Sequence, residues 1–159
     1  MSVLNFNQYL NEGKKGNRNA AGVAIIYQNK ILLVHPTGAS WKRPTCGIPK
    51  GGMEPGEDEM ESAIRELFEE TSIMVRPDQL EPSPYVVNIH SKKRGTRQLT
   101  YFLCKIEDLK EIGLLSETIP KDQLQLEEID WAKFVGSDEA YSITSQHQLI
   151  ILDRHLSLR

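Results

Sequence analysis

A dense run of acidic residues directly after a glycine-rich turn constrains this chain more than any other feature. Between Glu57 and Glu70, seven carboxylates accompany a single base, Arg65, so this window carries a charge of −6 (1 − 7). The whole chain carries −3, which leaves +3 for the remainder. Like charges at this spacing repel each other, and the acid is confined to one stretch. The pattern therefore indicates a site rather than a generally acidic surface.

The periodicity of the acidic window predicts an amphipathic helix over residues 58–71. At about 100° per residue, Glu66, Glu69 and Glu70 share one face of this helix. Arg65 precedes Glu69 by four residues, so its guanidinium can pair with that carboxylate and orient it. The apolar residues on the other side are expected to pack against the core, and they are Met60, Ile64, Leu67 and Phe68.

Clustered carboxylates on one helix face have two interpretations. One is an exposed acidic helix, in which a like-charged pair such as Glu66 and Glu70 would cost about 0.2–0.5 kcal/mol of helix stability. The other is a site for a hard cation, because oxygen ligands suit Mg²⁺ or Mn²⁺ and a bound cation removes the repulsion. Mg²⁺ is commonly held by a few carboxylates together with substrate phosphates. The second interpretation therefore predicts phosphate chemistry.

The rest of the chain has the pattern of one α/β domain. With 39% hydrophobic and 26% charged residues, it is too apolar for a disordered chain and too polar for a membrane protein. Asp58 and Glu61 have the spacing of a capping box at the start of the acidic helix. Strands on both sides of that helix predict an α/β sandwich of the mixed α+β kind. Strands are expected at 20–28, 30–35, 45–49, 85–91, 98–106 and 129–135, and a second helix at 145–156.

The N-terminal part of the chain predicts its location and organisation. Residues 1–19 are polar and are interpreted as a flexible leader before a single domain at 20–159. They lack the apolar core and basic flank of a signal peptide, so we expect a cytoplasmic protein that does not contact membranes. Two cysteines, Cys46 and Cys104, are expected to be reduced structural thiols. The leader also resembles those of proteins packaged into tailed-phage heads, cut after Leu-x-Glu (here residues 10–12); the alternative is a frayed terminus.

The order of residues from 51 to 73 resembles the Nudix box, the signature of Nudix hydrolases. The matching residues, at the spacing of that signature, are Gly51, Glu57, Arg65, Glu66, Leu67, Glu69, Glu70 and Ile73. The one departure is Ser72, where the family has glycine. A residue just after a helix often needs a positive φ, so we expect a small loss of stability at Ser72 and no loss of a ligand. A motif of this length is highly specific.

The resemblance implies an α/β/α sandwich around a mixed β-sheet and an Mg²⁺- or Mn²⁺-dependent pyrophosphohydrolase. Such enzymes cleave a nucleoside diphosphate linked to another moiety, X. By resemblance, the metal ligands are Glu66, Glu69, Glu70 and the carbonyl of Gly51. Glu57 would assist through water or a hydrogen bond, and Arg65 would orient a glutamate.

The resemblance leaves open which carboxylate takes the proton from the attacking water. Within the box, Glu66 and Glu69 are candidates for this general base. Outside the box, Glu127 and Glu128 are candidates, and the alternative for each is an exposed loop residue. Catalytic roles are therefore expected for Arg65, Glu66 and Glu69, with one of the later glutamates as a further candidate.

The nature of X is suggested by the residues before the box and by a basic turn. The approach to the box, with Trp41 and Lys50, resembles that of diadenosine polyphosphate hydrolases and of RNA 5′-pyrophosphohydrolases. Four bases within six residues (Lys92, Lys93, Arg94 and Arg97) suit a polyanion with more than two phosphates. Aromatic rings can stack on a base, although Tyr101 and Phe102 point to opposite faces of a strand, so at most one of them faces the pocket. The substrate-binding candidates are Trp41, Arg43, Lys50, Lys93, Arg94, Arg97 and Tyr101.

These features favour a diadenosine polyphosphate or a similar long-chain nucleotide as substrate. The alternatives are an RNA 5′ end, an inositol pyrophosphate, ADP-ribose, or a catalytically inactive nucleotide sensor. The four histidines show no spacing typical of ligands and are expected to be structural or surface residues. Trp131 is expected in the core, and the protein is expected to be a monomer or a homodimer.

Overall fold

The structure, a computed structural model, describes residues 19–93 and 95–157. Its strands are β1 (Ala20–Tyr27), β2 (Lys30–Pro36), β3 (Lys50–Gly52), β4 (Tyr85–Ser91), β5 (Gly95–Ile106) and β6 (Ile129–Gly136). Its α-helices are α2 (Glu59–Thr71), α3 (Ser137–Ile143) and α4 (Leu149–His155). Short 3₁₀ turns are η1 (Pro77–Gln79), η2 (Leu109–Ile112), η3 (Lys121–Gln123) and η4 (Gln146–Gln148).

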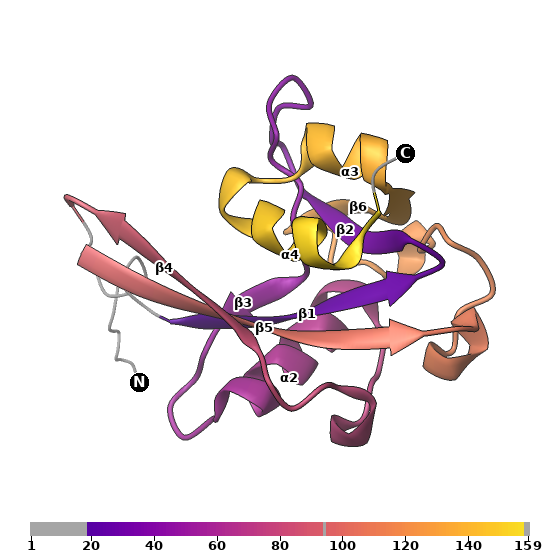
Figure 1. The fold of residues 1–159 in the computed structure, drawn as a ribbon, viewed down its shortest axis with the longest axis horizontal. Coiled ribbons are helices and arrows are strands. Elements are labelled where there is room, and N and C mark those ends of the chain that lie inside the picture. Colours follow the sequence, from indigo (N-terminus) through magenta and orange to yellow (C-terminus); the bar gives the residue numbers. More distant parts are fainter. Residues whose placement is uncertain (1–18, 94, 158–159) are drawn as a thin grey trace.

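The strands form one mixed sheet in the order β4-β5-β1-β2-β6, with β3 paired to β1 off this path. Helix α2 covers one face of the sheet, and α3 and α4 cover the other (Figure 1). The central pair, β1 and β5, is parallel, whereas β1–β2, β2–β6 and β4–β5 are antiparallel. The predicted α/β/α sandwich around a mixed sheet is therefore confirmed.

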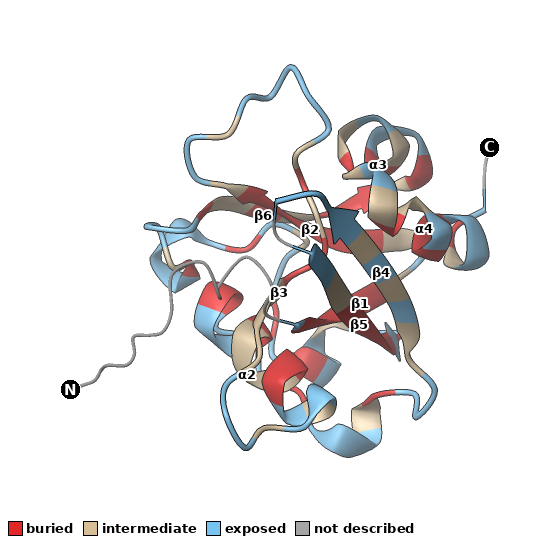
Figure 2. Ribbon diagram, turned by 90° about the vertical axis from the view of Figure 1, so that its left-hand side faces the viewer, coloured by how far each residue is buried: buried red, intermediate tan, exposed pale blue. Residues whose placement is uncertain are grey.

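The central strand β1 explains the position of the site. Its apolar run is buried on both faces, as expected for a strand with neighbours on both sides and helices above and below (Figure 2). It joins β2 through Gln28 and Asn29, whose φ angles of 50° and 60° suit the tight turn of a hairpin. Only the last residues of β1 pair with β2, while its first residues, 20–22, pair with β3. Strands β2 and β3 therefore diverge along β1.

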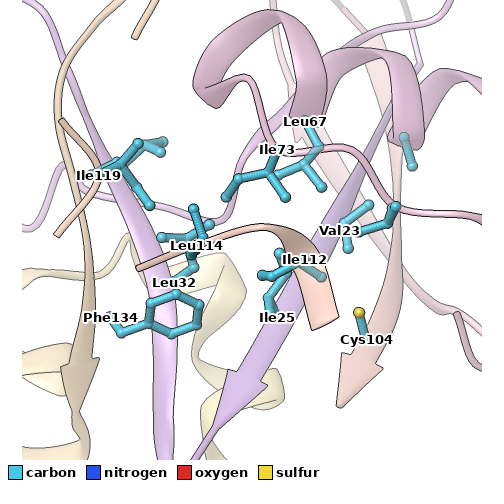
Figure 3. Close-up of a cluster of buried hydrophobic side chains, with 14 of the residues drawn as sticks. Val23, Ile25, Leu32, Leu67, Ile73, Cys104, Ile112, Leu114, Ile119 and Phe134 are labelled. Atoms are coloured by element: carbon cyan, nitrogen blue, oxygen red, sulfur yellow. The ribbon is translucent and has the colours of Figure 1, made fainter. Parts of the chain in front are cut away.

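Two apolar layers hold the sandwich together. Between the sheet and α2, residues such as Leu67, Ile73 and Phe134 form one cluster (Figure 3). Between the sheet and α3 and α4, residues such as Tyr101 and Ile151 form the other. Cys46 and Cys104 are buried free thiols, as predicted. Every helix of the described chain falls short of the length and apolar character needed to cross a bilayer.

The buried face of α2 differs from the predicted one. Phe68, predicted in the core, is 46% exposed, whereas Ala63 and Leu67 are fully buried. Glu70 is buried as well. The helix is therefore turned so that part of its acidic face lies against the sheet. Periodicity could not find this orientation, because a buried carboxylate is unfavourable in an ordinary core.

Several predicted boundaries also need correction. The strand expected at 45–49 is limited to isolated bridges at Cys46 and Gly47, and the regular strand β3 begins after Pro49, which has no N–H to donate to a ladder. The C-terminal helix begins at Leu149 instead of 145, after the 3₁₀ turn η4. Helix α3 was not predicted, because a seven-residue helix depends on tertiary packing more than on its own pattern.

Most of the predicted leader and one residue of the basic turn lie outside the residues that the structure describes. The predicted leader at 1–19 falls outside the described residues except for Asn19, and Arg94 also falls outside them. Asn19 belongs to the fold, since its carbonyl accepts a hydrogen bond from the Met53 N–H and its side chain accepts one from the Gln98 N–H. The division into a leader and one domain at 20–159 stays a prediction.

Candidate active site

The acidic helix is fixed at both ends by local hydrogen bonds. The predicted capping box is present, with Asp58 Oδ1 accepting from the Glu61 N–H at 2.8 Å and Glu61 Oε1 accepting from the Asp58 N–H at 3.0 Å. At the other end, Ser72 has the predicted positive φ, 65°, and its N–H donates to the Phe68 carbonyl. These caps set where the carboxylates of α2 lie relative to β3.

Arg65 connects the helix to the turn that precedes it. Its Nε and Nη2 donate to the two carboxylate oxygens of Glu57 at 2.6 and 3.0 Å, and Nη2 also donates to the Gly52 carbonyl. Its Nη1 donates at 3.0 Å to both Glu66 and Glu69. The hydrogen bonds from Arg65 hold the pKa of Glu57 below its usual range. The side chain predicted to orient one glutamate thus forms hydrogen bonds with three.

Glu66 lies directly against the backbone of β3. A Cβ placed on Gly51 would come within 2.0 Å of the Glu66 carboxylate carbon, so only glycine leaves room for this carboxylate. The Glu66 side chain is 12% exposed. Burial raises its pKa, and the neighbouring Glu69 and Glu128 raise it further, while Arg65 acts in the opposite direction.

Glu70 is the most buried carboxylate of the acidic helix. Its Oε1 has no hydrogen-bond partner among the described residues. Burial raises the pKa of Glu70 to about 8, with further contributions from the charges of Glu66 and Glu128, and Lys50 opposes the shift. A buried carboxylate with an unpartnered oxygen beside other acids is what a cation would stabilise.

The donor set suits a hard cation although the carboxylates do not converge. Within residues 19–93 and 95–157, no group of three His, Cys, Asp or Glu side chains could hold a metal ion as placed. The predicted ligands Glu66, Glu69 and Glu70 nevertheless offer only oxygen, and Glu70 has an oxygen without a partner. A cation at this site would compete with Arg65, which bonds to Glu66 and Glu69. The predicted ligands therefore match Mg²⁺ or Mn²⁺ in the type of donor atom they offer.

A pocket of about 310 Å³ lies beside these carboxylates. Its walls come from β2, the segment 45–50, the end of α2, and residues 128–129 and 145–148, so it occupies the place where β2 and β3 diverge. Glu70 and Glu128 contribute acidic groups to the wall. Glu127 is exposed and does not line this pocket, so of the two later glutamates only Glu128 is near the predicted ligands.

The same pocket has a basic side. Lys50 and His147 line it, and Arg97 is near enough for its charge to lower the pKa of both. Burial is the larger cause of each shift. His147, expected to be structural or on the surface, was missed as a pocket residue because it comes from the irregular turn η4, whose position the sequence pattern does not give. Lys50 and Arg97, both predicted to bind substrate, thus lie close enough in the fold for their charges to interact.

Tyr101 is buried behind the pocket and contacts it through the lining residue Gln148. Its ring is fully buried, and its hydroxyl accepts a hydrogen bond from Gln148 Nε2 at 2.9 Å. Gln148 Oε1 in turn accepts from the Ile48 N–H at 2.8 Å. The prediction that Tyr101 stacks on a base finds no support, because no face of its ring is open. Phe102 is buried in the opposite layer, so neither residue of the predicted pair is exposed.

Trp41 packs against two other aromatic rings, those of His35 and Trp131. Its ring stacks on the His35 ring, with centroids 3.8 Å apart and planes within 3°, and meets Trp131 edge to face. Buried His35 is held by Asp130, whose Oδ1 lies 2.6 Å from His35 Nδ1. Trp41 is 52% exposed, so about half of its side chain remains accessible beside these two contacts. Trp131, expected in the core, is only half-buried.

The remaining predicted residues lie farther out. Arg43 is exposed in the loop that carries Trp41, and Lys93 is exposed at the tip of the β4–β5 hairpin. Glu69 is also exposed on the helix surface, where Arg65 holds it. Among the predicted site residues, Lys50, Glu70 and Glu128 line the pocket, and Arg65 joins Glu57, Glu66 and Glu69 by hydrogen bonds. Arg43 and Lys93 do not line the pocket.

The chain is similar to known proteins in sequence and in fold. The NUDIX domain model matches residues 16–148. An Ap4A hydrolase from C. elegans superposes with a TM-score of 0.60 at 25% identity, covering 87% of this chain and 95% of that one. A MutT NUDIX hydrolase from Burkholderia pseudomallei gives 0.65 at 18%, covering 89% and 98%. A bifunctional NMN adenylyltransferase/ADP ribose pyrophosphatase from Francisella tularensis, complexed with AMP and Mn ion, gives 0.52 at 23%, covering 88% and 38%.

Proposed function

The chain belongs to the NUDIX family and is a pyrophosphohydrolase, and we propose that its substrates are diadenosine polyphosphates or nucleotides with similarly long phosphate chains. The observation that supports this proposal is the pocket, whose lining includes the acidic Glu70 and Glu128 together with Lys50 and His147, and Arg97 lies near enough for its charge to act on those last two residues. A chain of several phosphates can reach from a cation held by the acids to the basic groups beside them.

The acidic side is proposed to hold Mg²⁺ or Mn²⁺. Glu66, Glu69, Glu70 and the Gly51 carbonyl are the proposed ligands, and Glu57 fixes Arg65, which bonds to two of them. When bound, the cation neutralises phosphate charge and lowers the pKa of its water. Arg65 keeps Glu66 and Glu69 in place when no cation is bound, which limits the repulsion between these carboxylates.

A carboxylate at this site accepts the proton of the attacking water. Glu128 is our preferred candidate among the residues outside the box, because it lines the pocket next to Glu70 and Glu127 does not. Glu66 and Glu69 stay candidates within the box, although both already accept hydrogen bonds from Arg65 Nη1. A general base must contact the attacking water directly. Glu128 meets this need better than Glu66 or Glu69, because those two carboxylates are already hydrogen-bonded to Arg65.

The basic side is proposed to bind the distal phosphates. Lys50 is half-buried beside the acids, so its ammonium is a fixed point charge for a phosphate oxygen. Arg97 lies near the start of β5, and the exposed Lys92 and Lys93 precede it in the turn of the β4–β5 hairpin. The spread of positive charge from the pocket to this hairpin favours a long phosphate chain over the two phosphates of ADP-ribose.

The proposal is tested with the purified protein, Mg²⁺ and a substrate panel. The panel contains diadenosine polyphosphates of increasing length, ADP-ribose, an inositol pyrophosphate and a 5′-triphosphate RNA, with products resolved by chromatography. We expect hydrolysis to increase with phosphate-chain length and to stop when EDTA removes the cation.

Three other results would each revise the proposal in a specific way. Cleavage confined to RNA 5′ ends would assign the exposed hairpin to RNA. Cleavage confined to ADP-ribose would contradict the argument from the basic side. No cleavage of any substrate, together with binding of Mn²⁺ and nucleotide in calorimetry, would make the protein a nucleotide sensor.

Replacing Trp41 by alanine tests whether the nucleobase stacks on this half-exposed ring. Stacking of an aromatic ring on a base contributes about 1–3 kcal/mol, so we expect KM for a diadenosine polyphosphate to rise about tenfold with little change in kcat. An inositol pyrophosphate has no base, and its KM should not change. Trp41→Phe keeps a ring and serves as the matched control. An equal rise in KM for both kinds of substrate would show that Trp41 supports the loop rather than the base.

A further inference from the structure

We propose that Ser72 is a positioning residue for this reaction: its hydroxyl holds the segment 123–128 so that Glu128 stays in the pocket. This inference rests on the proposed function, and it starts from the position where the chain departs from the Nudix box. The family has glycine there, whereas this chain has a side chain with a hydroxyl. The structure assigns that hydroxyl a partner outside the box.

The backbone at Ser72 favours glycine. The residue follows the last turn of α2 with φ 65° and ψ 9°, the left-handed conformation in which a Cβ is unfavourable. Serine differs from glycine here by a hydroxyl group, which can form a hydrogen bond that glycine cannot. Its Oγ donates a hydrogen bond to the Gln123 carbonyl at 2.7 Å. The bond joins the end of the metal-ligand helix to a segment 51 residues later in the chain.

The segment after Gln123 is fixed at successive points. The Gln125 N–H donates to the Glu70 carbonyl at 3.1 Å, which is a second connection to the end of α2. The Glu128 N–H donates to the Gln125 carbonyl at 2.8 Å, and the Glu128 carbonyl accepts from the Thr37 N–H at 2.9 Å. Ser72 thus provides the first in a series of bonds that ends at Glu128.

Glu128 is the residue that this series places. It lines the pocket together with Glu70, and its negative charge is close enough to raise the pKa of both Glu66 and Glu70. Its backbone is bonded on both sides, but Glu128 is itself exposed, so its position depends on the segment that carries it. Loss of the Ser72 bond would let this segment move away from the acids for part of the time.

Ser72→Gly separates positioning from stability. Glycine suits the left-handed backbone, so this variant should unfold at the same temperature as the wild type or higher. It lacks the hydroxyl, and we expect kcat to fall about fivefold, which corresponds to about 1 kcal/mol, at unchanged KM. Hydrogen exchange gives a readout that needs no substrate: the amides of Gln125 and Glu128 should exchange faster in the variant.

Two further variants complete the test. Asparagine tolerates the left-handed conformation and has a side-chain N–H to donate, so Ser72→Asn should recover most of the lost kcat. In a Glu128→Gln background, which should itself lower kcat, Ser72→Gly should have no additional effect, because the residue acts through Glu128.

The outcomes distinguish this inference from the proposed function. An active wild type with an unchanged kcat or unchanged exchange in Ser72→Gly would overturn the positioning role and leave the enzyme assignment intact. An additive loss in the double variant, or a Glu128→Gln protein with wild-type kcat, would also overturn it. A wild type that cleaves none of the panel would instead remove the proposed function.

Discussion

Replacing Glu66 by glutamine is expected to lower kcat by about 10²- to 10⁴-fold while the protein stays folded. The substitution keeps the shape of the side chain, which is mostly covered and lies against Gly51, and removes its charge. A neutral amide is a poorer ligand for Mg²⁺ and cannot accept a proton, so both roles proposed for Glu66 are lost together. Steady-state kinetics on the best substrate of the panel measures the effect.

Glu59→Gln is the matched control for this variant. Glu59 is an exposed carboxylate in the first turn of the same helix, so its replacement changes the charge of α2 by the same amount. Its kcat should equal that of the wild type. Calorimetric titration with Mn²⁺ should show weaker binding for Glu66→Gln only. Wild-type kinetics in Glu66→Gln would contradict the assignment of Glu66 to the metal site.

The sequence was informative where the signal is local. The capping box of Asp58 and Glu61 and the positive φ of Ser72 both depend on residues within a few positions of one another. The spacing of the acids likewise gave the helix on which they lie. Local hydrogen bonding and backbone sterics determine such features, so they can be predicted from a single chain.

The parts that could not be predicted depend on tertiary packing. The orientation of α2, with Phe68 outward and Glu70 inward, is set by how the helix seats against β1 and β3. His147 and Gln148 reach the pocket through an irregular turn near the C-terminus. Tyr101 illustrates the limit: alternation correctly placed Tyr101 and Phe102 on opposite faces of the strand, but only the fold shows that both faces are covered there.

The fit of the Glu66 carboxylate against Gly51 gives the second large effect. Gly51 lies in β3 without a positive φ, so its backbone accepts an alanine, and only the space above it is limiting. The alanine Cβ would lie 2.0 Å from the Glu66 carboxylate carbon and 2.1 Å from its Oε1. Either the carboxylate or the strand must move, and the carboxylate is the end of a flexible side chain.

Gly51→Ala is therefore expected to lower kcat by about 10²-fold, because a displacement near 1 Å at a reacting group has an effect of this size. The loss of stability should be modest, about 1–3 kcal/mol in urea unfolding, since one methyl group is added to a crowded place. Gly136→Ala is the control, because a Cβ at that glycine meets nothing within 4 Å. If the effect acts through Glu66, Gly51→Ala should add little to the loss already caused by Glu66→Gln. A full additional loss in the double variant would mean that the methyl group disturbs the strand, and that the glycine before the acidic helix serves β3 rather than the carboxylate.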